Sequence, residues 1–393
     1  MPQVSQRARG MQESAIRKLD ALVARQQGVH FHRLNIGQPD VPTPEPMLSA
    51  IRNFQPKVVA YGPASGTAAC RAAAAAYQAR WSPGLGPEHA VITAGGSEGL
   101  LVAFTAICDP GDEILVPEPY YTNYNGFATV AGATVRPIRT RIEDAFAIPS
   151  DAVLDTLVTP KTRALVLNNP GNPTGVVYSR SELARILAWA RRHDLFVIAD
   201  EVYRQIWFDE PPTSALEFPE YADHVVVIDS LSKTWSACGA RAGFLYSRNA
   251  ELMEKIERLG QARLGPQPLA QEMAIAALNL PDSYYDALRA IWRSRVTALY
   301  EGLGRLGLVD VPKPQGAFYL MVRLPVDDAD AFARFLVTDF RHEGESVIVA
   351  PGSGFYADPA DGRQQIRLAA VNDAARLARA IEVLGKGLEA YRG

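Results

Sequence analysis

The sequence predicts an α/β protein whose central sheet is mainly parallel and flanked by helices, with a smaller α+β part toward the C-terminus. Two observations carry this prediction. The chain has 393 residues, 48% of them hydrophobic and 21% charged, which are ordinary globular values and allow a large core without disulfides or metals. Short apolar runs alternate with helical patterns, as in βαβ units.

The apolar runs of the first two thirds are short and rich in β-branched residues, which suits strands buried on both faces. The expected strands are 90–93, 113–116 (closed by Pro117), 164–167, 196–199, 225–228 and 242–246. Helical spacing of apolar residues predicts helices at about 97–108 and 181–193, the second with a serine cap.

After residue 249 the pattern changes to long helices and a few strands. Helices are expected at 249–264, 269–278, 284–306, 329–341 and 373–388, and strands at 318–322, 346–349 and 365–368. We therefore divide the chain into an N-terminal arm and small-domain segment (1–46), a large domain (47–285) and a small C-terminal domain (286–393).

Composition excludes several classes of protein. The chain carries 40 Lys and Arg against 43 Asp and Glu, a net charge of −3, so nothing points to nucleic acid. Cys70, Cys108 and Cys238 stand far apart and predict neither a metal site nor a disulfide framework. Met1 to Asp20 does not resemble a secretory signal, and no run suits a membrane helix. We expect a soluble cytoplasmic protein.

Two segments place reactive side chains directly after expected strands, where α/β folds bind ligands. Lys233, in Ser230-Leu231-Ser232-Lys233, is a candidate amine for a Schiff base with an aldehyde. Asp200 follows four apolar residues and needs a cationic partner, such as a protonated pyridine nitrogen. The alternative for Lys233 is an ordinary surface lysine, and the alternative for Asp200 is a structural salt bridge.

Two loops indicate an anion site and a rigid polar contact. The turn 95–99 (Gly-Gly-Ser-Glu-Gly) lets backbone N–H groups at a helix N-terminus approach an anion, and Arg241 offers a bidentate fork. The loop 169–175 (Asn-Pro-Gly-Asn-Pro-Thr-Gly) is restricted by two prolines and aims Asn172 at a ligand. Whether either X-Pro bond is cis stays open. A tight strand–helix turn is the plainer interpretation of 95–99.

Serine hydrolases and a non-catalytic regulator are alternatives from other classes. The turn 95–99 fits the G-x-S-x-G pattern with Ser97 as nucleophile, but His342 is the only late histidine and adjoins an expected helix end. Ser230 to Lys233 fits S-x-x-K, but no K-T-G follows. A DNA-binding regulator would need a basic extension before Gln38, which the sequence lacks.

With residues 169–175, Asp200-Glu201-Val202-Tyr203 and Ser230–Lys233 in this order, the chain resembles the class I/II aminotransferases from about Leu34 onward. These are pyridoxal 5′-phosphate-dependent enzymes of fold type I. The resemblance implies that Lys233 is the Schiff-base lysine and proton shuttle, and that Asp200 keeps the pyridine nitrogen protonated. It further implies that Tyr203 and Asn172 bind the ring oxygen of the cofactor and that Tyr121 stacks on its ring.

The resemblance also implies where the phosphate and the substrate bind. The phosphate residues would be Gly96, Ser97, Ser230, Ser232 and Arg241, together with Tyr61 from a neighbouring subunit, so a homodimer with shared active sites is expected. Arg367 would clamp the substrate α-carboxylate, with Asn172 and the backbone of Gly37 beside it.

The implied reaction is ping-pong transfer of an amino group between an L-amino acid and a 2-oxo acid. A β-lyase, decarboxylase or amino-acid oxidase would share nearly all these residues and stays open as an alternative. Some bacterial aspartate-type members carry Lys where this chain has Ser97, so no strict preference for aspartate is expected.

Overall fold

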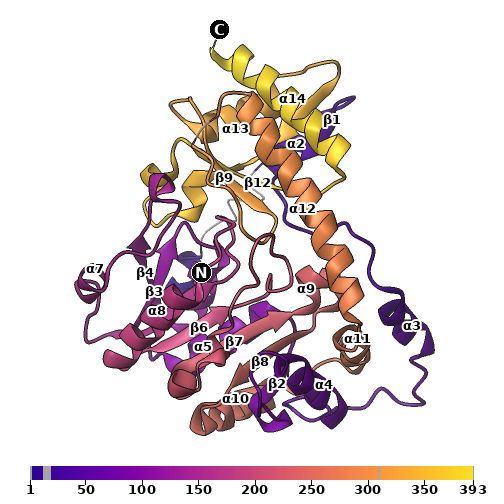
Figure 1. Cartoon of the computed structure of the whole chain (residues 1–393), viewed down its shortest axis with the longest axis vertical. Helices are drawn as coiled ribbons and strands as arrows, with labels where there is room; N and C mark the ends of the chain where they lie inside the picture. The colour runs from indigo at the N-terminus through magenta and orange to yellow at the C-terminus, as the bar shows by residue number, and fades with distance from the viewer. Residues whose placement is uncertain (1, 12–18, 309, 393) are drawn as a thin grey trace.

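A computed structural model describes residues 2–11, 19–308 and 310–392 of the chain (Figure 1). Its main sheet has seven strands in the order β2-β8-β7-β6-β5-β3-β4. The strands are β2 (Ala90–Thr93), β3 (Glu113–Glu118), β4 (Thr134–Arg139), β5 (Thr162–Asn168), β6 (Phe196–Asp200), β7 (Val225–Ser230) and β8 (Gly243–Ser247). All neighbours pair in parallel except β8, which runs antiparallel to both β2 and β7. The expected mainly parallel sheet is confirmed.

Helices cover both faces of this sheet. Ala164 and Val166 of β5 belong to one core, with α5 (Gly96–Ile107), α6 (Asn123–Ala131) and α10 (Ala250–Arg263). Leu165 and Leu167 belong to the opposite core, with α4 (Ala68–Gln78), α8 (Arg180–Arg192) and α11 (Pro268–Leu278). Successive residues of a strand point to opposite faces, so continuous apolar strands require cover on both.

The sequence pattern missed some details of the main sheet. The sequence did not predict β4, because buried and exposed residues are mixed in it and Pro137 lies within it. Both features are typical of an edge strand. β3 continues past Pro117 to Glu118 instead of ending there. Helix α8 begins one residue before the expected start and is capped by Ser179, whose hydroxyl accepts a hydrogen bond from the Glu182 N–H.

A second, smaller part lies at the other end of the molecule (Figure 1). It holds the antiparallel sheet β11-β12-β9, with β9 (Tyr319–Arg323), β11 (Ala350–Pro351) and β12 (Gln365–Ala369), and the parallel pair β1 (His30–Arg33) and β10 (Glu345–Ile348). Its helices are α2 (Asp20–Val23), α12 (Asp282–Arg305), α13 (Ala329–Thr338) and α14 (Ala374–Arg392). The pairing of β1 with β10 joins the N-terminal segment to the C-terminal part.

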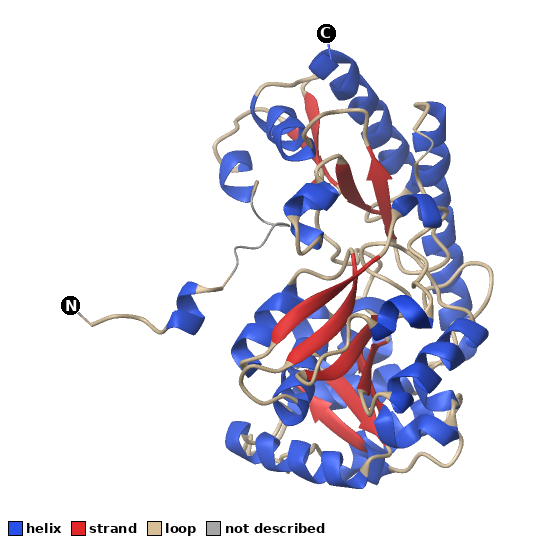
Figure 2. Cartoon of the chain, turned by 90° about the vertical axis from the view of Figure 1, so that its left-hand side faces the viewer, coloured by secondary structure: helices blue, strands red, loops and turns tan. Residues whose placement is uncertain are grey.

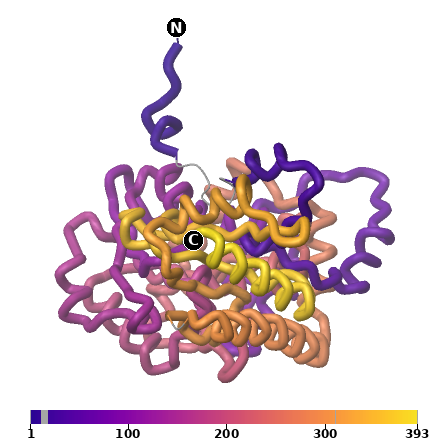
Figure 3. Tube along the Cα trace, turned by 90° about the horizontal axis from the view of Figure 1, so that it is seen from above, coloured from indigo at the N-terminus to yellow at the C-terminus, as the bar shows by residue number. Residues whose placement is uncertain are grey.

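Several short segments flank these layers, and one helix of the smaller part connects the two. The helices α3 (Glu45–Asn53), α7 (Asp151–Asp155) and α9 (Leu231–Thr234) are short, and α12 runs from beside α11 toward the smaller part (Figure 1). Residues 2–11, with α1 (Gln6–Arg9), project away from the body (Figures 2 and 3). Part of the expected arm, residues 12–18, lies outside the described residues. None of the helices in the described ranges combines the length and the apolar character that a bilayer crossing needs.

Candidate active site

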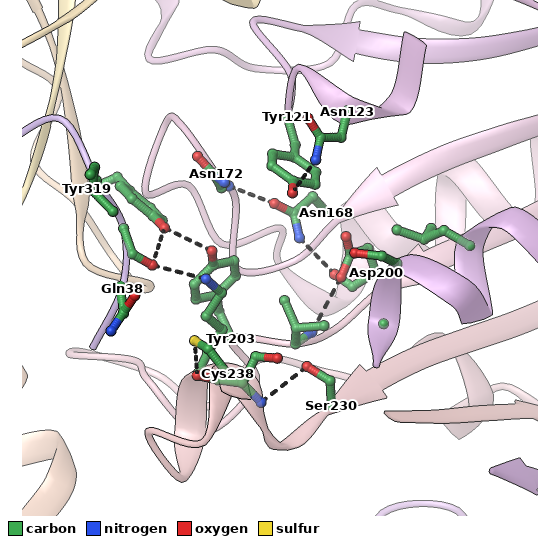
Figure 4. A pocket seen from close by; sticks show the side chains of 18 of the residues that line it. Gln38, Tyr121, Asn123, Asn168, Asn172, Asp200, Tyr203, Ser230, Cys238 and Tyr319 are labelled. Carbon is green, nitrogen blue, oxygen red and sulfur yellow. Dashed lines mark hydrogen bonds between the residues drawn. The ribbon is translucent and has the colours of Figure 1, made fainter. Parts of the chain in front are cut away.

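A cavity of about 570 Å³ lies where β5, β6 and β7 end, between the main sheet and the smaller part (Figure 4). It collects all of the residues that the family resemblance assigns to the site except Tyr61. They are Gly37, Gly96, Ser97, Tyr121, Asn172, Asp200, Tyr203, Ser230, Ser232, Lys233, Arg241 and Arg367. The loops at the carboxyl ends of neighbouring parallel strands meet at one sheet edge, which explains the convergence.

Lys233 enters the cavity from α9, the single helical turn that follows β7. Ser230 caps this turn, since its hydroxyl accepts a hydrogen bond from the Ser232 N–H at 3.3 Å. The Lys233 ammonium donates to the Gly37 carbonyl oxygen at 2.9 Å and lies 5.8 Å from the centre of the Tyr203 ring. The lysine therefore contacts both the main sheet region and the N-terminal segment.

Asp200 ends β6 with only 4% of its surface exposed. Its carboxylate accepts hydrogen bonds from the Tyr124 hydroxyl at 2.7 Å and from the Val202 N–H at 3.4 Å. Burial raises the pKa of Asp200 to about 6, although the Tyr124 bond and the charge of Lys233 oppose the rise. It forms no ion pair with any residue that the structure describes. The site thus holds a buried carboxylate that no described cation contacts directly.

Two aromatic side chains face the same space. The Tyr203 hydroxyl lies 2.9 Å from the Tyr319 hydroxyl, and burial raises the pKa of Tyr203 well above 10, so Tyr203 stays protonated and can donate. The Tyr121 ring packs edge-on against Tyr124, with centroids 5.5 Å apart, and its hydroxyl accepts from the Asn123 amide at 2.8 Å. Tyr121 is therefore held as a fixed wall of the cavity.

The turn before α5 forms an anion cradle. Gly95 has φ +90°, and a Cβ there would lie 2.6 Å from the Arg241 Nη2 atom, so a side chain would displace the guanidinium. Arg241 donates to the carbonyl oxygens of Ala94 and Cys238, both at 3.1 Å. The twelve-residue helix α5 directs its N-terminus at the same space. Guanidinium, helix N-terminus and serine hydroxyls together suit a phosphate group.

Arg367, on β12, forms the opposite end of the cavity and is 1% exposed. It donates to the Asn172 side-chain oxygen at 3.1 Å and to the Asn35 carbonyl oxygen, while its Nε atom is buried with no partner among the described residues. Burial lowers the pKa of Arg367 from its usual value. A buried guanidinium with an unused donor and no described carboxylate beside it is suited to a carboxylate ligand.

The loop that carries Asn172 is fixed from both sides. The Asn172 N–H donates to the Asn168 side-chain oxygen at 2.6 Å, and the Asn168 amide donates to the Asp200 carbonyl oxygen at 2.8 Å. The peptide bonds before Pro170 and Pro173 are both cis, which answers the question that the sequence left open. Asn172 therefore faces the cavity beside Arg367.

Two of the singled-out residues lie away from this cavity: Tyr61, which is expected to serve the site of a neighbouring subunit, and His342. Tyr61 does not line this cavity and is 85% exposed. His342 lies in the turn before β10, where its N–H donates to the Glu345 carbonyl oxygen, and it does not line the cavity with Ser97. The serine-hydrolase interpretation through Ser97 and His342 is therefore wrong. Sequence reasoning missed Tyr124 and Tyr319, since neither lies in a recognised motif and only the tertiary contacts reveal them.

Comparisons with known proteins extend over most of the chain. The family described as aminotransferase class I and II matches residues 29–384. An aspartate aminotransferase of Thermotoga maritima is 33% identical over 342 residues, which cover 86% of this chain and 87% of that protein. An arginine–pyruvate transaminase of Pseudomonas aeruginosa is 32% identical over 339 residues, 85% of each chain. The solved structure of a double mutant of Thermus thermophilus aspartate aminotransferase has a TM-score of 0.90 and 29% identity, over 98% of this chain and 100% of that one.

Proposed function

Since this chain belongs to the class I and II aminotransferases and is a transaminase of fold type I that depends on pyridoxal 5′-phosphate, we propose that Lys233 carries the cofactor and Arg367 the substrate. The reaction moves an amino group between an amino acid and a 2-oxo acid. One observation supports this assignment of roles above all. The buried carboxylate of Asp200, which forms no ion pair with a described residue, lies in one cavity with Lys233, Arg241 and Arg367.

The residues of the cavity fit the cofactor group by group. When bound, pyridoxal 5′-phosphate supplies an electron-withdrawing ring that stabilises negative charge at the substrate Cα. Asp200 would face the protonated ring nitrogen, Tyr203 and Asn172 the ring oxygen, and Tyr121 the ring face. The phosphate residues would be Gly96, Ser97, Ser230, Ser232 and Arg241.

Lys233 transfers the proton, and Arg367 orients the substrate. With the cofactor bound, the amine of Lys233 would accept the proton from the substrate Cα and deliver it to the carbon of the cofactor's aldehyde group. The amino acid and the 2-oxo acid would use this one site in turn, which is a ping-pong sequence. Arg367 orients the substrate by a bidentate pair with its α-carboxylate, next to Asn172 and Gly37. Ser97 carries no charge, which favours a donor other than aspartate alone.

We also propose that the chain divides into segments 1–46, 47–285 and 286–393, with the first and last closing over the substrate. The distribution of core residues supports this division. Leu19, Val23 and Leu34 share one core with residues from Leu288 to Leu388, into which Tyr203, Ile206 and Phe208 also pack. A second core consists of residues from Met47 to Tyr285 alone. Helix α12 spans the boundary and connects the two parts.

A homodimer with shared active sites is the assembly that we propose, in the cytoplasm. Its support is the segment around Tyr61, where Val58 and Val59 are 75% and 68% exposed and Tyr61 itself is 85% exposed. A run of exposed apolar side chains indicates a contact surface. In that assembly Tyr61 reaches the phosphate site of the partner subunit.

Mixing two inactive variants tests the shared site. Lys233→Ala and Tyr61→Ala each spoil one residue of a composite site, so hybrid dimers contain one site with both residues intact. We expect the exchanged mixture to regain activity that neither variant shows alone. If Tyr61→Ala is fully active by itself, or if exchanged hybrids stay inactive, Tyr61 does not serve the partner's site.

The visible absorption of the purified, cofactor-loaded enzyme tests the roles of Lys233 and Arg367. We expect a panel of L-amino acids to bleach the band of the wild type and to identify the donor class. Lys233→Ala should bind cofactor without turnover, and Arg367→Lys should weaken donor binding, because Lys cannot form the bidentate pair. Substantial turnover by Lys233→Ala would contradict the assignment.

A further inference from the structure

We propose that Tyr319 is a positioning residue for both Arg367 and Tyr203. Its ring orients the guanidinium of Arg367, and its hydroxyl orients the hydroxyl proton of Tyr203. The inference rests on the roles proposed above for Arg367 and Tyr203. No sequence motif singled out Tyr319. It lies on β9 of the smaller part, whereas Tyr203 follows β6 of the main sheet in the chain and packs into the same core as Tyr319.

Tyr319 occupies a bridging position. It is the first residue of β9, pairs with Ala369 of β12 and is 1% exposed, yet it lines the cavity. Figure 4 shows its hydroxyl directed toward the hydroxyl of Tyr203. A side chain in this place contacts both ends of the candidate site.

The ring of Tyr319 acts on Arg367. The guanidinium carbon of Arg367 lies 4.6 Å from the centre of the Tyr319 ring and 5.0 Å from that of Phe355. Contact with two aromatic rings fixes the plane of a guanidinium, and such cation–π contacts are strongest where water is excluded. The plane matters because a bidentate pair with a carboxylate requires it.

The hydroxyl of Tyr319 acts on Tyr203. It lies 2.9 Å from the Tyr203 hydroxyl and donates toward the Gly37 carbonyl oxygen at 3.4 Å, the same oxygen that accepts from Lys233. A hydroxyl has one proton. When Tyr319 donates to Gly37, Tyr203 must donate to Tyr319, and when Tyr319 donates to Tyr203, the Tyr203 proton is free for a ligand. Tyr319 thereby directs the proton of Tyr203.

Gly37 provides a separate sign that the site is fitted to this tyrosine. A Cβ built on Gly37 would lie 1.8 Å from the Tyr319 hydroxyl oxygen and 2.6 Å from its ring. Any side chain at residue 37 would therefore expel Tyr319. The backbone expected to contact the substrate carboxylate is thus packed directly against the residue that holds Arg367.

Two substitutions separate the ring from the hydroxyl. Tyr319→Phe keeps the ring and removes the two hydroxyl contacts, whereas Tyr319→Leu removes both. Tyr356→Phe is the matched control, because that tyrosine is also buried in the smaller part, donates to Gln365 at 2.8 Å and does not line the cavity. The cofactor-loaded enzymes are compared by pH titration of the visible band and by rapid mixing with the best donor of the panel.

We expect Tyr319→Phe to shift the titration midpoint of the band by about half a pH unit or more, through the altered Tyr203 proton, while the apparent donor dissociation constant stays within about twofold. Tyr319→Leu should raise that constant by about fivefold or more, as loss of a buried cation–π contact implies. Tyr356→Phe should match the wild type in both measurements.

A titration midpoint in Tyr319→Phe equal to that of Tyr356→Phe would overturn the inference, even if Tyr319→Leu does not fold. If the wild type itself shows no band with added pyridoxal phosphate, the proposed roles fail as well. The spectra of the wild type therefore distinguish the failure of the proposed function from the failure of this inference alone.

Discussion

The two carboxylates at the end of β6 are neighbours in sequence but lie in opposite environments. Asp200 faces the cavity and has two hydrogen-bond donors, the Tyr124 hydroxyl and the Val202 N–H. Glu201 faces away and accepts from the Ser214 hydroxyl and the Ala215 N–H, both at 2.9 Å. It also pairs with the guanidinium of Arg204. Both carboxylates are almost fully buried, at 4% and 3% exposed.

The presence of a cationic partner beside Glu201, and not beside Asp200, distinguishes a structural carboxylate from one that serves a ligand. A buried charge without a partner costs several kcal/mol, so a chain normally supplies the partner itself, as Arg204 does for Glu201. Arg204 is in turn held by Glu217 and by the face of Trp81, 4.0 Å away. Asp200 has no such cation in the described chain, and the protonated ring of the cofactor would complete it.

The largest effect is expected at Asp200, the carboxylate without an ion-pair partner among the described residues. Asp200→Asn should lower turnover about 10³-fold, because it removes the charge that keeps the ring nitrogen protonated, while leaving a fold that the neighbouring hydrogen bonds can still accept. Steady-state kinetics with the best donor, together with circular dichroism, measure both. Near-wild-type turnover by a folded Asp200→Asn protein would mean that the ring nitrogen lies elsewhere.

Replacing Glu201, the carboxylate that is paired with Arg204, should affect stability more than turnover. Glu201→Gln leaves Arg204 buried with a weakened partner set and should lower the free energy of unfolding by about 3 kcal/mol. Urea denaturation measures this loss, and turnover per folded molecule should stay within a few-fold of the wild type. Glu217→Gln is the control, because Glu217 is the more distant partner of Arg204, at 3.3 Å against the shorter contact with Glu201, and should cost less.

The pH dependence of stability provides a test of the burial of Asp200. Burial raises the pKa of Asp200 from 3.8 to about 6, so in the cofactor-free protein the native state holds a proton that the unfolded state releases between these values. The contribution to stability is complete below about pH 4 and is lost as the pH rises through 6, a change of roughly 3 kcal/mol.

Asp200→Asn removes this contribution, whereas Glu201→Gln keeps it. Urea denaturation of the cofactor-free proteins at pH 4.5, 5.5 and 6.5 should therefore show the wild type losing stability relative to Asp200→Asn as the pH rises. Burial also raises the pKa of Asp229, to about 7, and that of Glu201; both groups remain in the wild type and in Asp200→Asn, so the difference between these two proteins reports mainly on Asp200. Parallel curves for the wild type and Asp200→Asn would contradict the assigned shift.

The smallest effect concerns the hydrogen bond that supports Asp200. Tyr124→Phe keeps the ring against Tyr121 but removes the donor to the carboxylate, and should raise the cofactor dissociation constant about tenfold. Tyr120→Phe is the control, since its hydroxyl donates to Asn125 at 3.1 Å and does not reach Asp200. Equal dissociation constants for the two variants would show that Tyr124 only packs.

The same contrast explains how much the sequence could predict. Lys233, Asp200, Asn172 and the turn at 95–99 lie at or just beyond the ends of strands, so local patterns and the family resemblance place them together, and one cavity brings them together. Tyr124 and Tyr319 act through contacts between residues 76 and 116 positions apart in the chain, which no local pattern encodes. The antiparallel direction of β8 likewise depends on tertiary packing.

Nuclear magnetic resonance of pyridoxal phosphate labelled with ¹⁵N in its ring tests the central claim most directly, because it reports whether the ring nitrogen carries a proton. In the loaded wild type and in Glu201→Gln, we predict a protonated ring nitrogen at neutral pH. In Asp200→Asn, we predict an unprotonated one. A neutral ring nitrogen in the wild type, or the same signal in all three proteins, would contradict the claim that the cofactor completes Asp200.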